Sequence, residues 1–256
     1  MTARKERLKN YLEFLWVMSE KETKVRYKRA VFGFLWVVLN PALQMLIIGV
    51  VFSLFIKIPN YFLFLFTGLL PWQFFSLSLS KATPSIVNER SLLQKAKFPV
   101  EAVPVSIILS NFFNMIVSLV IFLPILFISV GPSIASLFLT ILALLWLLVL
   151  TIGLSLLTVS FNVKYRDINF FVQTILILWF YATPVLYNLS LVPESLNLLF
   201  SLNPLTSIFE ILHYSLLGRG VIEAKIVIAN IVLSLVIIFL GVFAFKRERK
   251  YFVDWL

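Results

Sequence analysis

The sequence predicts an all-α integral membrane protein with six membrane-spanning helices and both termini in the cytoplasm. Of its 256 residues, 61% are hydrophobic and only 13% are charged, and the mean hydropathy is +0.99. A soluble domain carries roughly 45–50% apolar and about 25% charged residues. One soluble core could not bury this excess, because chain size limits the share of surface that folding removes from water. We therefore expect much of the apolar surface to face lipid.

Six apolar runs are long enough to span a bilayer. A helix needs about 20 apolar residues to cross roughly 30 Å of hydrocarbon. Turn-forming residues such as Gly131-Pro132 separate the runs. Prolines inside the runs are compatible with spans when neighbouring helices supply partners for the freed carbonyls. The predicted spans are about 31–56, 61–83, 103–129, 133–161, 168–188 and 226–245.

The distribution of Lys and Arg predicts the orientation. Of the 22 basic residues, 19 lie in the N-terminal arm, between Lys81 and residue 101, in the fourth connection or in the C-terminal tail. The other three, on the opposite side, are Lys57, Arg219 and Lys225. Connections rich in Lys and Arg stay in the cytoplasm, so both termini are predicted to be cytoplasmic. The basic residues form no aromatic-interleaved groove of the kind that holds nucleic acid, and we expect no nucleic-acid partner.

The N-terminal arm, residues 1–30, is predicted to lie at the cytoplasmic membrane interface. Within residues 4–18, apolar side chains recur at helical spacing opposite Arg and Lys. This pattern is typical of an amphipathic helix in the membrane interface, and the alternative is a solvated basic helix. The apolar positions are Leu8, Tyr11, Leu12 and Leu15.

Two further segments fit neither a span nor a simple loop. The cytoplasmic segment 84–101 carries a charged face and two adjacent leucines. It fits either a short surface helix that docks a soluble partner or an ordinary charged loop. The outer segment 189–224 contains two apolar runs, 194–202 and 205–217, that are too short to span. They are predicted to be re-entrant or interfacial helices over the outer mouth of any pathway.

Residues for catalysis, ion coupling or cofactor binding are scarce. None of the 12 acids falls in the centre of a predicted span, whereas proton- and sodium-coupled carriers usually keep an ionisable group there. No G-x-x-x-x-G-K-[ST] loop is present to hold ATP. The chain has no Cys and one His, His213, which excludes thiolate and multi-histidine metal sites. We expect no cofactor in this chain and no catalysis, which leaves a pathway or scaffold protein powered by something else.

Aromatic residues make up 16% of the chain, and several lie near the ends of predicted spans. Such residues commonly form belts at the two membrane interfaces. The functional alternative is that some of them line a passage and stack on sugar rings, because an aromatic ring offers a flat apolar face. The candidates are Trp36, Trp72, Trp179, Tyr181 and Tyr187.

Five motifs follow one another along nearly the whole chain: Tyr27-Lys28-Arg29-Ala30-Val31-Phe32-Gly33-Phe34-Leu35-Trp36, Gly68-Leu69-Leu70-Pro71-Trp72, Leu92-Leu93-Gln94-Lys95, Tyr165-Arg166-Asp167 and Asn203-Pro204-Leu205. Each is weak alone, but the ordered series resembles the ABC-2-type permeases that export polysaccharides. Within that family the chain is most similar to the membrane subunits of O-antigen exporters (Wzm-type). Capsule and teichoic-acid exporters are near relatives.

The resemblance implies an ABC-2 (type V-like) exporter fold and a homodimeric channel in the cell inner membrane. It implies that two copies of a separate cytoplasmic ABC ATPase subunit bind the dimer and hold the ATP and Mg²⁺. It further implies that an undecaprenyl-linked, O-antigen-type polysaccharide crosses outward. On this interpretation the chain is a transport subunit and not an enzyme, and its remaining partners are membrane lipids.

The resemblance also assigns roles to residues. It makes the 88–97 segment the coupling helix that contacts the ATPase, with Asn88, Glu89, Arg90, Leu92, Leu93, Lys95 and Lys97. It makes the 191–217 helices an outer gate, with Asn203, Pro204, His213 and Tyr214. His213 stands where many relatives carry Arg, so a cation is not carried over to that position. The cytoplasmic loop between the fourth and fifth spans contributes Tyr165, Arg166 and Asp167.

Three alternatives stay open at this stage. A permease of the same fold could export capsule, teichoic acid or small hydrophobic molecules. A membrane-embedded glycolipid enzyme would need a cluster of acids or histidines that the sequence does not contain. A structural membrane anchor would need no pathway at all.

Overall fold

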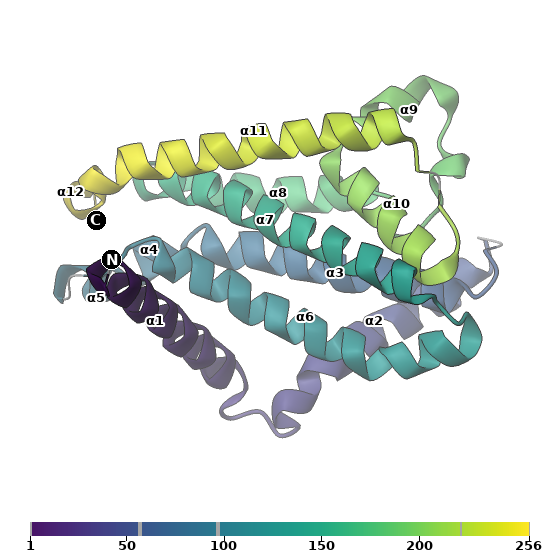
Figure 1. The fold of residues 1–256 in the computed structure, drawn as a ribbon, viewed down its shortest axis with the longest axis horizontal. Coiled ribbons are helices and arrows are strands. Elements are labelled where there is room, and N and C mark those ends of the chain that lie inside the picture. Colours follow the sequence, from purple (N-terminus) through teal and green to yellow (C-terminus); the bar gives the residue numbers. More distant parts are fainter. Residues whose placement is uncertain (1, 56–57, 96–97, 221, 256) are drawn as a thin grey trace.

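The chain folds into an elongated bundle of helices (Figure 1). The computed structural model describes residues 2–55, 58–95, 98–220 and 222–255, and within these ranges it contains helices and no strand. The all-α class predicted from the sequence is therefore confirmed. Five helices are long and apolar enough to cross a membrane. They are α2 (Trp36–Ser53), α3 (Tyr61–Ala82), α6 (Ala102–Ser129), α7 (Ile134–Lys164) and α11 (Ala224–Glu248).

A bent helix pair and one shorter helix complete the apolar part of the bundle. α9 (Glu194–Ser201) and α10 (Pro204–Leu217) meet at an angle of 96°, and together they would pass as a sixth span by length and composition. α8 (Asp167–Tyr181) has only 15 residues, whereas the sequence predicted a span over 168–188. The two short runs predicted in the outer segment thus correspond to α9 and α10.

Pro184 explains why α8 ends early. A residue that precedes proline is disfavoured in helical conformation, and α8 stops two residues before Thr183. The chain then continues without helix through Leu186, and residues 183–186 are all buried. Tyr61 donates its hydroxyl hydrogen to the carbonyl oxygen of Leu186 at 2.9 Å. Irregular backbone is tolerated at membrane depth when protein surrounds it in this way.

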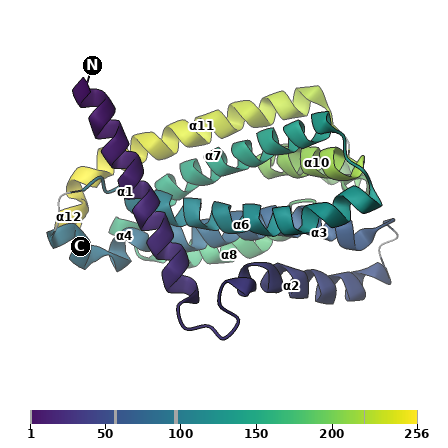
Figure 2. The same cartoon turned by 60° about the horizontal axis from the view of Figure 1, so that its bottom comes forward.

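Both termini lie at one end of the bundle, together with α4 (Ser85–Asn88), α5 (Arg90–Lys95) and α12 (Phe252–Trp255) (Figure 1). We call this the terminal end. α9 lies at the opposite end. α1 (Thr2–Tyr27) crosses the terminal end obliquely (Figure 2). Since it ends at Tyr27, the predicted interfacial helix continues nine residues beyond its expected end at residue 18. Three short 3-10 turns complete the described elements at Gly33–Leu35, Leu189–Leu191 and Arg249–Tyr251.

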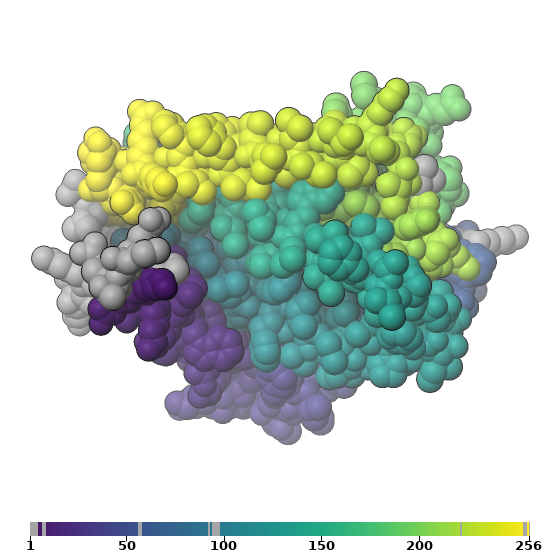
Figure 3. All heavy atoms as spheres, in the orientation of Figure 1, coloured from purple at the N-terminus to yellow at the C-terminus, as the bar shows by residue number. Residues whose placement is uncertain are grey.

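α3 forms the centre of the bundle. In its most apolar window 72% of the residues are buried, against 17% for α2 and for α11. α11 lies along α7 at the surface (Figure 3), and the two helices cross at glycines. A Cβ added to Gly241 would lie 2.0 Å from the carbonyl oxygen of Gly153. Small residues allow such close approach, which is how helices pack tightly inside a bilayer.

A proline in α2 is accommodated by a neighbouring helix. Pro41 has no N–H, so the carbonyl four residues earlier, at Val37, lacks its helical partner. Ser118 of α6 donates its hydroxyl hydrogen to that carbonyl at 2.8 Å. The bond fixes the start of α2 against α6 and fulfils the sequence-based expectation that a neighbour satisfies the freed carbonyl.

Candidate functional site

The predicted coupling segment is anchored on the bundle by apolar side chains. Ile86 of α4 is fully buried in a cluster with residues of α6, α7 and the C-terminal tail, and Leu93 and Phe98 pack against its edge. Asn88 and Arg90 are exposed and Glu89 is partly exposed. α4 and α5 therefore present polar groups outward while their apolar groups hold the bundle. The side chains of Leu92 and Lys95 and the whole of Lys97 lie outside the described residues.

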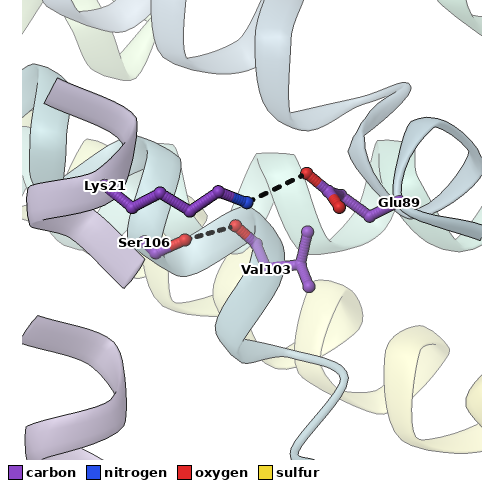
Figure 4. A network of polar contacts seen from close by, with 4 residues as sticks. All are labelled: Lys21, Glu89, Val103 and Ser106. Carbon is purple, nitrogen blue, oxygen red and sulfur yellow. Dashed lines mark hydrogen bonds and ion pairs between the residues drawn. The ribbon is translucent and has the colours of Figure 1, made fainter. Parts of the chain in front are cut away.

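α1 makes direct contacts with this coupling segment. The Nζ of Lys21 lies 3.7 Å from a carboxylate oxygen of Glu89, as Figure 4 shows. The rings of Phe14 and Phe98 are 5.5 Å apart between centroids. Burial, together with the negative charge of Glu101, raises the pKa of the Tyr11 hydroxyl. Ser106 donates its hydroxyl hydrogen to the carbonyl of Val103 in the first turns of α6 (Figure 4).

The C-terminal tail contacts the same region from the other side. Phe252 of α12 is buried and its ring packs edge-on against Phe245, with centroids 5.4 Å apart. Arg249 lies 3.8 Å from Glu101, which directly precedes α6. Lys164 lies over the ring of Trp255, 5.4 Å from its centroid. The predicted loop residues Tyr165, Arg166 and Asp167 are exposed beside this contact.

An open groove, lined by both amides and apolar side chains, runs between α2, α3 and α8. It has a volume of about 670 Å³. Gln73 donates a hydrogen bond to Gln44 at 2.8 Å, and Gln44 donates one to Asn40 at 3.0 Å. Gln173 lines the groove from α8. Exposed amides on membrane-spanning helices are costly in hydrocarbon, so this face fits a water-filled passage or another protein surface.

The sequence analysis did not single out these amides, which share one groove in the structure. Two signals were present. Asn40 and Gln44 are four residues apart, and Gln73, Ser76 and Ser80 recur at helical spacing, so each set lies on one face of its helix. What the sequence could not supply is that the polar faces of α2, α3 and α8 meet.

The candidate aromatics occupy different positions. Trp72 and Tyr181 both line the groove, and Tyr181 is 61% exposed. Trp179 donates its indole hydrogen to Asn203 at 3.0 Å, and Tyr187 donates its hydroxyl hydrogen to the carbonyl of Tyr181 at 2.6 Å. Trp36 lines a smaller cavity beside the groove. The structure thus brings two of the five together on the groove.

Asn203 ties α8 to α10. Its side-chain oxygen accepts hydrogen bonds from the Leu205 backbone N–H and from Trp179, and it caps α10. Its amide nitrogen donates to the Ala182 carbonyl at 3.1 Å and to the Thr183 hydroxyl at 3.0 Å. Pro204 follows at the first helical position, where its missing N–H costs nothing.

His213 lies in the interior. It is 1% exposed, and its ring stacks on Phe64 with centroids 4.0 Å apart. Tyr214, the next residue, is 49% exposed. Of the two predicted gate residues on this turn of α10, only Tyr214 therefore reaches the surface. Successive helical residues point about 100° apart, which places one inward and one outward.

Known proteins resemble this chain over nearly its whole length. The sequence profile of the family described as "ABC-2 type transporter" matches residues 13–217, from the middle of α1 to the end of α10. The chain is 32% identical over 253 residues to the O-antigen export system permease protein RfbA of Myxococcus xanthus, with 96% of each chain covered. It is 30% identical over 248 residues to a protein of the same name from Klebsiella pneumoniae, with 95% of each covered.

Proposed function

The chain belongs to the ABC-2 type transporter family, and we propose that it is the permease subunit that moves a lipid-linked, O-antigen-type polysaccharide outward across the inner membrane. The names of its relatives support O-antigen as the class of cargo. The observation that carries the proposal is the groove of mixed polar and apolar lining between α2, α3 and α8. It combines amides, hydroxyls and the aromatic side chains of Trp72 and Tyr181. Hydroxyl-rich sugar rings need polar hydrogen-bonding partners and flat apolar faces, and this groove offers both.

The family implies an ABC ATPase as partner, and the terminal end is the surface on which we expect it to dock. The excess of Lys and Arg around the termini and α4–α5 supports a cytoplasmic placement of that end. Exposed Asn88 and Arg90 would meet the ATPase, which supplies the ATP and Mg²⁺. The buried apolar side of α4 would carry its motion into the bundle.

A second copy of the chain would close the groove. The groove is open along α2 and α8, so it exposes amides that a lone subunit would have to leave against lipid. Two subunits facing one another across α2 and α8 would enclose a passage lined by two such grooves. The polyprenyl chain of the substrate would stay in the bilayer while the glycan passes between the subunits.

We expect ATP hydrolysis to act through α1. Displacement of α4–α5 by the ATPase would pull on the Lys21–Glu89 ion pair and on the Phe14–Phe98 contact. α1 leads through a short connection into α2, which forms one wall of the groove. Movement of α1 would thereby change the separation of α2 and α8 at the dimer seam.

Export in cells tests this proposal. In a strain that lacks the gene for this chain, lipid-linked glycan should accumulate on the cytoplasmic side, and the wild-type gene should restore surface glycan. Gln73→Leu should lower the restored export at least several-fold, whereas Leu235→Ala, on the exposed face of α11, should not. Undiminished surface glycan in the deletion strain would overturn the proposal. Accumulation of a capsule or teichoic-acid intermediate would mean that this glycan, and not O-antigen, is the cargo.

A further inference from the structure

A small polar cavity adjoins the groove near the end of α1. Its volume is about 80 Å³. Asn40 and Gln73 line both the cavity and the groove, so the two spaces share a wall. Arg26 of α1 and Asn114 of α6 line the cavity but not the groove.

Arg26 lines the cavity and is only partly buried, and among the described residues its side chain has one hydrogen-bond partner, Asn111. One guanidinium nitrogen donates to the side-chain oxygen of Asn111 at 2.6 Å, and Asn111 in turn donates to Ser78 at 3.1 Å. A guanidinium carries five N–H donors. Among the described residues no carboxylate forms an ion pair with Arg26. Lys81 lies within electrostatic range of both Arg26 and Glu22, so two cations and one carboxylate lie near the site and their summed charge is positive.

Asn114 supplies an independent sign of a missing ligand. Its side chain is 8% exposed and lines the cavity, and neither atom of its amide group has a hydrogen-bond partner within the described structure. Buried polar groups are nearly always hydrogen-bonded in folded proteins. The unpartnered amide nitrogen of Asn114, beside an arginine, fits a ligand that accepts hydrogen bonds and carries negative charge.

The size of the cavity limits the ligand. One water needs about 10–15 Å³ of such space, so the cavity has room for a group of several heavy atoms and not for a sugar chain. A phosphate group satisfies the size, the charge and the hydrogen-bonding demand together.

We propose that Arg26 and Asn114 bind a phosphate group of the polyprenyl carrier to which the glycan is attached. This inference rests on the proposed function. With the phosphate in the cavity, the first sugar would lie against Asn40 and Gln73 in the groove, and the polyprenyl chain would extend into lipid. Arg26 and Lys21 belong to the same helix, α1. A movement of α1 that is transmitted through the Lys21–Glu89 pair would therefore also move Arg26 and the phosphate bound to it.

Direct binding tests the inference. The full chain, in complex with its ATPase subunit in phosphatidylcholine nanodiscs, is titrated with radiolabelled undecaprenyl pyrophosphate. Arg26→Ala and Asn114→Leu should each weaken binding at least ten-fold, and Arg26→Lys should weaken it less. Arg29→Ala is the matched control, since Arg29 is exposed three residues away, and it should bind like the wild type. Monodisperse elution of each variant complex verifies folding.

Three further arms identify the ligand. Undecaprenol, which lacks phosphate, should bind more weakly and with no dependence on Arg26. Phosphatidylglycerol and inorganic pyrophosphate should compete poorly; equal competition by either would overturn carrier recognition in favour of a general headgroup site or a free-anion site. Wild-type affinity in folded Arg26→Ala and Asn114→Leu would also overturn the inference. Such a result would leave the proposed function standing, because that function depends on the deletion strain and not on this cavity.

Discussion

Lys21 of α1 forms an ion pair with Glu89, which separates α4 from α5, with 3.7 Å between Nζ and the carboxylate oxygen. The two residues are far apart in the sequence, and both belong to parts of the chain that crowd the terminal end. The pair joins the segment on which we expect the ATPase to act to the helix that leads into the groove wall α2. We therefore expect that substitutions in this pair lower the coupling of ATP hydrolysis to export without unfolding the protein.

The first prediction concerns this pair. Both side chains are substantially exposed, at 47% and 31%, and such ion pairs contribute only about 0–1 kcal/mol to stability. Lys21→Ala or Glu89→Ala should therefore leave the melting temperature nearly unchanged. Each should lower the glycan exported per ATP hydrolysed several-fold, because one of the two contacts between α1 and the coupling segment is lost.

The charge-reversed double variant Lys21→Glu/Glu89→Lys is the control. It rebuilds the pair with opposite polarity and should recover much of the coupling in reconstituted vesicles. If both single variants export as efficiently per ATP as the wild type, the Lys21–Glu89 pair does not transmit the motion.

The second prediction concerns the crossing of α7 and α11. A methyl group at Gly241 would overlap the backbone of Gly153, so Gly241→Ala should force the helices apart. Overpacking of this kind costs typically about 1–3 kcal/mol, and the melting temperature in detergent should fall.

Gly49→Ala is the matched substitution. Its new methyl would meet the ring of Phe62 at 2.5 Å, and this ring is 42% exposed and can move aside. The melting temperature of Gly49→Ala should therefore stay near that of the wild type. Equal losses in both variants would mean that the close glycine crossing has no special role.

The third prediction concerns Asn203. Asn203→Ala removes the cap of α10 together with hydrogen bonds to Trp179, Ala182 and Thr183. A lost cap costs about 1 kcal/mol and each further hydrogen bond about 1 kcal/mol, so the loss should exceed that of an ordinary cap substitution. Thermal unfolding should report it, with Asn197→Ala in exposed α9 as control. A melting temperature equal to that of the control would show that the contacts of Asn203 do not stabilise the fold.

The fourth prediction separates a role in transport from a belt role for Tyr181. Its ring is exposed on the groove, whereas only its backbone carbonyl bonds Tyr187. Tyr181→Ala should keep that hydrogen bond and the fold, and it should lower export several-fold by removing a stacking surface. Phe239→Ala, equally exposed on α11, should export normally. Normal export by both variants would show Tyr181 to be a belt residue.

Much of the helical architecture was predictable because single spans are encoded locally. The apolar runs placed α3, α6, α7 and α11 within a few residues of their ends, since each needs only length and composition. The early end of α8 was also encoded, in Thr183-Pro184, but the apolar run past it suggested a longer span. Irregular backbone there is satisfied by partners from other helices, since Tyr61 of α3 bonds Leu186 and Asn203 bonds Ala182, and no local pattern reveals these contacts.

The candidate site was less predictable because it depends on contacts between distant segments. The charge and leucine pattern of 84–101 allowed either a docking helix or a loop; the structure forms two short helices there, α4 and α5, with Ile86 packed against the tail, and the docking role stays a prediction. His213 was expected at an outer gate, yet its ring stacks in the interior on Phe64. A single histidine carries no periodic signal, so the sequence could not say which way it faces.

Photocrosslinking from the groove tests the central claim most directly. A benzoylphenylalanine is placed at Gln73, or at Val236 on the exposed face of α11, in cells whose ATPase subunit is inactive and whose export is arrested. We predict that ultraviolet light joins lipid-linked glycan to the Gln73 position and not to the Val236 position. Absence of glycan at Gln73, or equal labelling at both positions, would contradict the account.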